Sequence, residues 1–149
     1  MRIKIDLQNE EALAGLPDQD DFAAWIDAAL MQKFDNLEHT IRVVSETESQ
    51  ALNLQYRRKD APTNILSFAA DSDYLDYECL GDLVICAQIV EQEAQQQGKS
   101  LQAHWAHMVV HGMLHLQGYD HQNINETDEM EALEAKILST LGYSNPYNS

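Results

Sequence analysis

The alternation of apolar and polar residues along this chain predicts four strands and five helices. Near the N-terminus, Ile3, Ile5 and Leu7 alternate with polar residues, which indicates a strand that buries one face. Between Asp20 and Lys33 the apolar residues recur every three or four positions, a spacing typical of an amphipathic helix. The same patterns predict strands at residues 40–44, 64–69 and 80–86 and helices at residues 47–57, 87–97, 101–116 and 125–141. The resulting order, β-α-β-α-β-β-α-α-α, predicts an α+β fold in which about five helices pack with one small mixed sheet.

Residues that favour helix ends and turns stand between these segments. Ser45 and Glu48 have the spacing of a capping box, and Ser100 can cap the helix that follows it. Gly98 stands where the preceding helix is expected to end. Residues 71–78 are acidic and polar, so we expect them to form a surface loop.

Length and composition agree with one globular domain over residues 1–149. Hydrophobic residues make up 44% and charged residues 23% of the chain, which are ordinary proportions. No segment resembles a signal peptide or a membrane span, so a soluble, cytoplasmic protein is expected. Cys79 and Cys86 would lie about 23 Å apart on one extended segment and are expected to be free thiols.

The net charge limits the classes of partner. The chain has 25 acidic and 9 basic residues, which gives a formal charge of −16. A field of this sign opposes general binding to DNA, to other nucleic acids or to an anionic membrane. One local exception is the basic cluster formed by Arg57, Arg58 and Lys59. Arg57 can clamp a phosphate bidentately and Lys59 is a further candidate substrate contact, while stabilisation of a helix C-terminus is the alternative interpretation.

The histidines of the C-terminal half have the spacing of a metal site. His111 and His115 are four residues apart on a predicted helix, so their rings can converge on one ion. Gly118 ends that helix and allows the chain to turn back, which makes His121 the candidate third ligand. Three neutral histidines leave one coordination position open for water or substrate, as in catalytic zinc sites.

Residues 111–121 (HGMLHLQGYDH) share the spacing of the metzincin proteases but lack their general base. Those proteases need Glu directly after the first histidine, and this chain has Gly112 there. We therefore expect an empty space beside the metal, in which an added carboxylate would repel an incoming phosphate. This difference favours phosphate chemistry over peptide hydrolysis.

Three segments together resemble the YbeY family of bacterial rRNA maturation factors. Residues 52–68 (LNLQYRRKDAPTNILSF) resemble the first signature of that family, and residues 80–85 (LGDLVI) resemble the second. Residues 111–121 match its metal motif. Two positions differ from the family pattern: Asn64 stands where the family often has Asp, and Ala69 where it often has Pro. Neither is a metal ligand, so we expect them to affect local loop geometry more than activity.

The resemblance implies a metal-dependent endoribonuclease specific for single-stranded RNA. Such proteins act in 16S rRNA 3′-end maturation, ribosome assembly and ribosome quality control. The family pattern implies one Zn²⁺ ion per chain, held by His111, His115 and His121, and it makes Arg57 the catalytic arginine. The implied partners are the 16S rRNA precursor, a small-subunit ribosomal protein and an assembly GTPase.

The sequence leaves the reaction details open. The nucleophile is either the RNA 2′-hydroxyl or a water activated by the ion, and the general base is that water, Asp120, His107 or none. We favour a role for Asp120 in orienting a ligand. For His104 and His107 we expect ordinary packing or exposure, with a place near the metal as the alternative. Two other functions compete with the nuclease: a non-catalytic assembly factor that contains a metal, and a hydrolase of another substrate.

Overall fold

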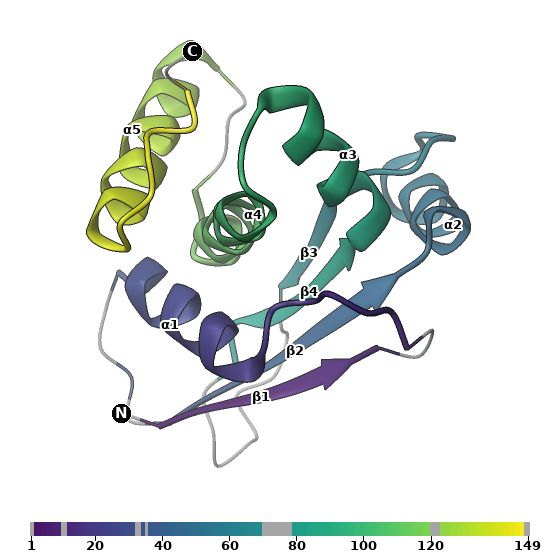
Figure 1. Cartoon of the computed structure of the whole chain (residues 1–149), viewed down its shortest axis with the longest axis horizontal. Coiled ribbons are helices and arrows are strands. Elements are labelled where there is room, and N and C mark those ends of the chain that lie inside the picture. The colour runs from purple at the N-terminus through teal and green to yellow at the C-terminus, as the bar shows by residue number, and fades with distance from the viewer. Residues whose placement is uncertain are drawn as a thin grey trace.

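A four-stranded sheet and five helices make up the described part of the chain (Figure 1). The computed structural model describes residues 2–9, 12–31, 34, 36–69, 79–119 and 123–147. In chain order the elements are β1 (Arg2–Gln8), α1 (Gln19–Ala29), β2 (Asn36–Val44), α2 (Glu46–Arg57), β3 (Ile65–Ala69), β4 (Gly81–Cys86), α3 (Ala87–Gln97), α4 (Leu101–Leu116) and α5 (Ile124–Thr140). This order and the α+β class confirm the prediction from the sequence.

The sheet is mixed, as the sequence predicts. Its strand order is β1-β2-β4-β3, in which β1, β2 and β4 are parallel and β3 pairs antiparallel with β4. Buried and half-buried residues alternate along most of β2. Strand β4 is buried on both faces, because Leu83 and Ile85 belong to the main core while Val84 and Cys86 belong to a second, smaller cluster.

The helices are divided unequally between the two faces of the sheet. The main core joins α1, α4 and α5 to one face, and α2 covers the smaller cluster through Leu52. Figure 1 shows α4 near the centre, surrounded by α1, α3, α5 and the sheet. All residues of α4 from His104 to Leu114 are buried except His111, which is half-buried. The C-terminal part of α4 therefore brings its histidines from the core toward the surface.

Two element boundaries differ by four residues from the sequence-based expectation, whereas the other differences are of one residue. Helix α1 ends at Ala29 and not at Lys33, because the Gln117 side chain binds its end: Gln117 Nε2 donates to the Ala29 carbonyl, and Gln117 Oε1 accepts from the Met31 amide, both at 2.8 Å. Strand β2 begins at residue 36, four residues before the predicted start, because it pairs with β1 over the whole length of that strand. Helix α5 begins at residue 124, one residue early, with Asn123 as its cap.

Two smaller expectations are confirmed and one falls outside the described residues. Ser45 Oγ accepts a hydrogen bond from the Glu48 amide and caps α2, and no disulfide joins Cys79 and Cys86. No helix in the described ranges is long and apolar enough to cross a membrane. The predicted acidic loop at 71–78 lies outside the described residues.

Candidate functional site

A groove of about 620 Å³ lies where the end of α2, strand β3 and the C-terminal half of α4 meet. Helix α2 contributes its last two residues, the loop before β3 contributes two more, and β3 forms one wall. The lining residues are Tyr56, Arg57, Thr63, Asn64, Ile65, Leu66, Ser67, Phe68, His111 and His115. The first signature and the metal motif, separated by more than forty residues in the sequence, therefore share one cavity.

The paired histidines lie one helical turn apart on α4. The centroids of the His111 and His115 rings are 4.9 Å apart and the rings meet at 75°. The predicted third ligand, His121, and the neighbouring Asp120 lie outside the described residues. Within the described part of the chain, no three histidine, cysteine or acidic side chains form a metal-binding group. The structure thus brings together two of the three predicted ligands.

The contacts of His111 fit a ligand of a transition-metal ion. His111 Nδ1 lies 2.8 Å from Glu134 Oε1, and a carboxylate accepts a hydrogen bond from an N–H group. The Nδ1 atom of a neutral His111 then carries the proton, and Nε2 carries the lone pair that a metal needs. A histidine that donates its other ring nitrogen to a carboxylate is the usual arrangement at protein zinc sites.

Glu134 is a site residue that the sequence reading missed. It lies on α5 and its side chain is only 1% exposed. Burial alone would raise the pKa of its carboxyl group, but hydrogen bonds from the two nearby histidines and from Tyr147 outweigh burial and lower the pKa to about 2. The sequence held one signal: Glu134 occupies the same helical face as the buried Met130, Ile137 and Leu138. An acidic residue on an apolar stripe needs polar partners inside the protein.

The three residues of the basic cluster have different surroundings. Arg57 is the last residue of α2 and lines the groove. Arg58 follows with a left-handed backbone (φ 58°), and its amide donates to the Leu54 carbonyl at 3.1 Å. Lys59 is exposed and is not among the described residues that line the groove. Arg57 thus stands in the last turn of α2, where a cation favours the helix end, and also lines the groove, so its position is compatible with both interpretations of the basic cluster.

Asn64, one of the two departures from the family pattern, has a specific partner. Its Nδ2 donates to Glu93 Oε1 at 3.1 Å and to Oε2 at 3.2 Å, and its Oδ1 accepts the Ile65 amide at 2.7 Å. Glu93 also lies 2.9 Å from His104 Nε2. An aspartate at position 64 would place a second carboxylate against Glu93, so the amide suits this position. The other departure, Ala69, is the exposed last residue of β3.

Gly112 does not face an empty space, which corrects the expectation from the sequence. An added Cβ would lie 2.7 Å from both Ile65 Cδ1 and Leu83 Cδ2 and 3.3 Å from Ser67 Oγ. Position 112 is where α4 packs directly on β3 and β4. Glycine is present because two apolar side chains occupy the volume that a side chain would need, so its presence carries no argument about the class of substrate.

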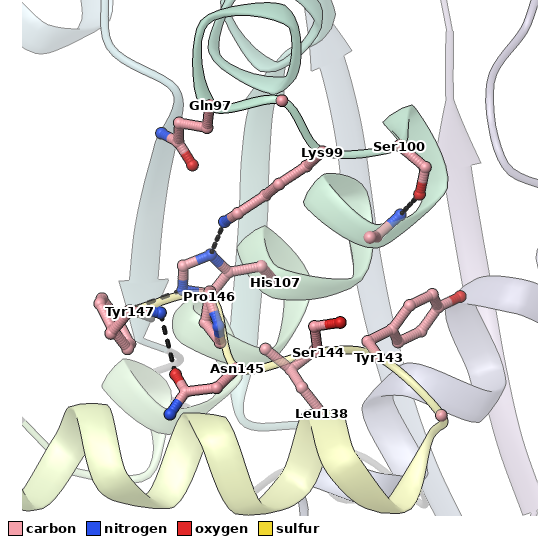
Figure 2. Close-up of a pocket in the computed structure, with 13 residues that line it drawn as sticks. Gln97, Lys99, Ser100, His107, Leu138, Tyr143, Ser144, Asn145, Pro146 and Tyr147 are labelled. Atoms are coloured by element: carbon pink, nitrogen blue, oxygen red, sulfur yellow. Dashed lines mark hydrogen bonds between the residues drawn. The ribbon is translucent and has the colours of Figure 1, made fainter. Parts of the chain in front are cut away.

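His104 and His107 are both buried on α4, and neither is among the residues that line the groove. His104 contacts Glu93, whereas His107 lines a second pocket, of about 600 Å³, between the α3–α4 connection and the segment after α5 (Figure 2). Burial lowers the pKa of His107 and favours its neutral form. Both side chains are thus held by polar contacts in the interior and are not exposed, and His107 also lies 3.3 Å from Glu134, the partner of His111.

The fold and the groove define an α+β protein that places paired histidines and an arginine in one cavity. The family model described as endoribonuclease YbeY matches residues 5–142, and the chain belongs to this family. The family description names a hydrolase that acts on RNA. The solution structure of TM1509 from Thermotoga maritima is similar to this chain with a TM-score of 0.52 and 22% identity, over 99% of this chain and 96% of that chain. This likeness confirms the fold.

Proposed function

We propose that this chain is a metal-dependent endoribonuclease that cleaves single-stranded RNA in the groove between α2, β3 and α4. One observation carries the proposal: Arg57 and the His111–His115 pair, which come from separate motifs, line the same cavity. One Zn²⁺ ion per chain would be held by His111 and His115 together with His121. When bound, such an ion supplies Lewis-acid catalysis, by polarising a phosphoryl oxygen or lowering the pKa of a water.

Arg57 acts on the substrate phosphate. Its guanidinium has donors in a planar fork that matches two phosphate oxygens, and negative charge grows on those oxygens as the phosphodiester reacts. A donor aimed at growing charge accelerates such reactions by about 10²–10³-fold. Lys59 lies two residues beyond Arg57 and would hold the RNA backbone outside the cavity as it approaches.

Tyr56 supplies a reason for preferring single strands. It lines the groove next to Arg57 and is 58% exposed, although large aromatic side chains are usually buried. Its ring and that of Phe68 meet in a T-shaped arrangement, with centroids 5.0 Å apart, so the ring is supported by Phe68 while much of the residue stays accessible. Unpaired bases can stack on such a ring, whereas bases within a duplex are already stacked on each other.

The position of His107 argues against one of the candidate general bases. His107, a candidate from the sequence, contacts Tyr147 and Lys99 on the side of α4 that faces the second pocket. It is therefore poorly placed to take a proton from RNA in the groove. The candidates that we keep are a water activated by the ion, Asp120, or no general base, with either of the two nucleophiles named above.

In the cell this activity would serve 16S rRNA 3′-end maturation, ribosome assembly and ribosome quality control. The charge of −16 repels RNA at a distance, so docking on another protein would bring the groove to its substrate. A small-subunit ribosomal protein and an assembly GTPase are the partners we propose, in the cytoplasm.

A cleavage assay on matched single-stranded and duplex RNAs, with metal-free and zinc-reconstituted protein, tests the proposal. We expect cleavage only of single strands and only by the reconstituted protein. Arg57→Ala should lower the rate by about 10²-fold or more at unchanged metal content. Arg58→Gly is the matched control, because it removes the same charge and suits the left-handed backbone, and it should keep most of the activity. Equal losses in the two variants would show that only bulk charge matters.

Two further outcomes separate the competing functions. Tyr56→Ala should raise KM for single-stranded RNA by roughly 5–150-fold, the range that stacking of one base supports, whereas Tyr56→Phe should be close to wild type. A zinc-loaded protein that binds RNA but cleaves neither substrate would favour the non-catalytic assembly factor. Cleavage of duplex RNA at the same rate would contradict the proposed preference for single strands.

A further inference from the structure

The buried carboxylate of Glu134 is the meeting point of three polar side chains. His111 Nδ1 lies 2.8 Å from Glu134 Oε1, and Tyr147 Oη donates to Glu134 Oε2 at 2.6 Å. His107 Nε2 lies 3.3 Å from Glu134 Oε1 and 3.1 Å from Tyr147 Oη. The four residues come from α4, from α5 and from the segment that follows α5.

Only one assignment of protons satisfies these contacts. The Lys99 ammonium can only donate, and it lies 3.4 Å from His107 Nδ1, so that nitrogen carries the lone pair and His107 Nε2 carries the proton (Figure 2). His107 Nε2–H is then shared between Tyr147 Oη, at 3.1 Å, and Glu134 Oε1, at 3.3 Å, while the tyrosine hydroxyl donates to Glu134 Oε2. Every donor in the network therefore points toward the carboxylate, which keeps Glu134 charged and in one position.

We propose that Glu134 is the positioning residue for His111, and that Tyr147 and His107 hold Glu134 in place for this role. The carboxylate fixes His111 in the tautomer that has its proton on Nδ1 and orients the ring, so that Nε2 is presented as a metal donor. This inference rests on the proposed function, because it takes His111 as a metal ligand. It extends the site from the groove through α4 to the residues around Tyr147.

Stability alone gives no reason for this network. Burying a carboxylate is costly, and apolar residues of similar size commonly replace buried ionic networks without loss of stability. Position 134 lies on the same face of α5 as Met130, Ile137 and Leu138, where an apolar side chain would pack well. The feature that an apolar residue could not provide is the acceptor for His111 Nδ1–H.

The segment after α5 completes the network from outside. Tyr147 is 44% exposed, but its hydroxyl reaches inward to Glu134, and Asn145 Oδ1 accepts the Tyr147 amide at 2.9 Å. Figure 2 shows Tyr147 and Asn145 across the second pocket from Lys99, with the His107 ring between Lys99 and Tyr147. The second pocket is thus lined by Lys99, His107 and Tyr147, which belong to the hydrogen-bond network around Glu134.

Zinc affinity measured without RNA tests the proposal. Glu134→Gln keeps the size of the side chain, but its single acceptor cannot serve the donors that meet at the carboxylate. Competition with a chromogenic chelator should show zinc bound about 10–100-fold more weakly by this variant, the range seen when the outer partner of a ligand is lost. Glu129→Gln is the matched control, because Glu129 is exposed on the same helix and loses the same charge. It should bind zinc as the wild type does.

A second readout distinguishes positioning from a general effect on the fold. In the metal-free wild type at about pH 8.5, ¹⁵N NMR of the imidazoles should show His111 with its proton on Nδ1. In Glu134→Gln the same ring should exchange between both tautomers, since no anion holds the Nδ1 proton. An unchanged His111 tautomer together with wild-type zinc affinity would overturn the proposal.

Tyr147→Phe keeps the proposal testable if Glu134→Gln does not fold. The ring of Tyr147 stays and only the hydroxyl that donates to Glu134 is lost, so we expect a folded protein with zinc affinity reduced several-fold; unchanged affinity would overturn the proposed support by Tyr147. Zinc binding by the wild-type protein tells whether the metal site or only the role of Glu134 is wrong. If the wild-type protein binds no zinc, the proposed metal site fails; if it binds zinc and Glu134→Gln binds it equally well, only the role of Glu134 fails.

Discussion

Replacing Gly112 by alanine should destabilise the fold, even though alanine is the better helix former. The new Cβ would lie 2.7 Å from Ile65 Cδ1 and from Leu83 Cδ2. Carbon atoms in contact prefer about 3.5–4.0 Å, so each neighbour has to move by about 1 Å. Leu83 is fully buried and Ile65 is 8% exposed, which leaves both with little room to move.

The expected magnitude is the difference between two opposing effects. Overpacking a core by one methyl group costs about 1–3 kcal/mol. Replacing glycine by alanine inside a helix returns about 1 kcal/mol. The net loss in the free energy of unfolding should lie between about 0 and 2 kcal/mol, which lowers Tm by up to roughly 8 °C for a chain of this size.

Urea unfolding of the metal-free protein measures this loss, and a double-mutant cycle locates its cause. Ile65→Val removes the Cδ1 atom that the new Cβ would meet, so Gly112→Ala should cost less in that background than in the wild type. Ala103→Gly, on the more exposed N-terminal turn of α4, measures the helix-propensity contribution by itself.

Either of two results would refute the reasoning. The first is that Gly112→Ala stabilises the protein by the full helix-propensity gain. The second is that Gly112→Ala costs the same free energy of unfolding with and without Ile65→Val. Gly112→Glu extends the test, because it adds a buried charge to the same clash. We expect it to lose folded protein, and not to lose RNA cleavage selectively as an empty space beside the metal would imply.

Three further outcomes follow from the structure. His115→Ala should lower the metal content well below one ion per chain; elemental analysis that finds the wild-type content would reject His115 as a ligand. Gly81→Ala should lower the free energy of unfolding by about 3 kcal/mol or more, because φ is +144° and the new Cβ would lie 2.1 Å from the Phe68 carbonyl oxygen in the neighbouring strand. A denaturation midpoint equal to that of the wild type would contradict this. Burial lowers the pKa of His39, so below about pH 6.5 the unfolded chain binds a proton that the folded chain does not. As the pH decreases below that value, this group lowers the free energy of unfolding by up to about 1.4 kcal/mol per pH unit. His39→Val should reduce this dependence of stability on pH by as much as the contribution of one proton, which is about 1.4 kcal/mol per pH unit. An unchanged dependence between about pH 6.5 and 5 would show that His39 does not titrate as expected.

The sequence by itself determined the elements and the candidate site. Apolar patterning, together with cap and turn residues, predicted the nine described elements in order, because most of them bury one regular stripe and the fully buried β4 stands out as a continuous apolar run. The spacing of His111 and His115 predicted their pairing, since residues four apart on a helix share a face. The basic cluster predicted Arg57 as a phosphate contact, because consecutive cations stand out in a chain with a charge of −16.

Tertiary structure alone decided the features that depend on contacts between distant segments. The end of α1 is set by Gln117, 86 positions further along the chain than Met31. Gly112 is glycine because β3 and β4 press against α4, which no local pattern records. Glu134 reaches His111, and Tyr147 reaches Glu134, only after α5 and the segment beyond it pack against α4. Local periodicity encodes which face of an element is buried, but which residues meet across a buried interface is fixed by packing, and that depends on the whole fold.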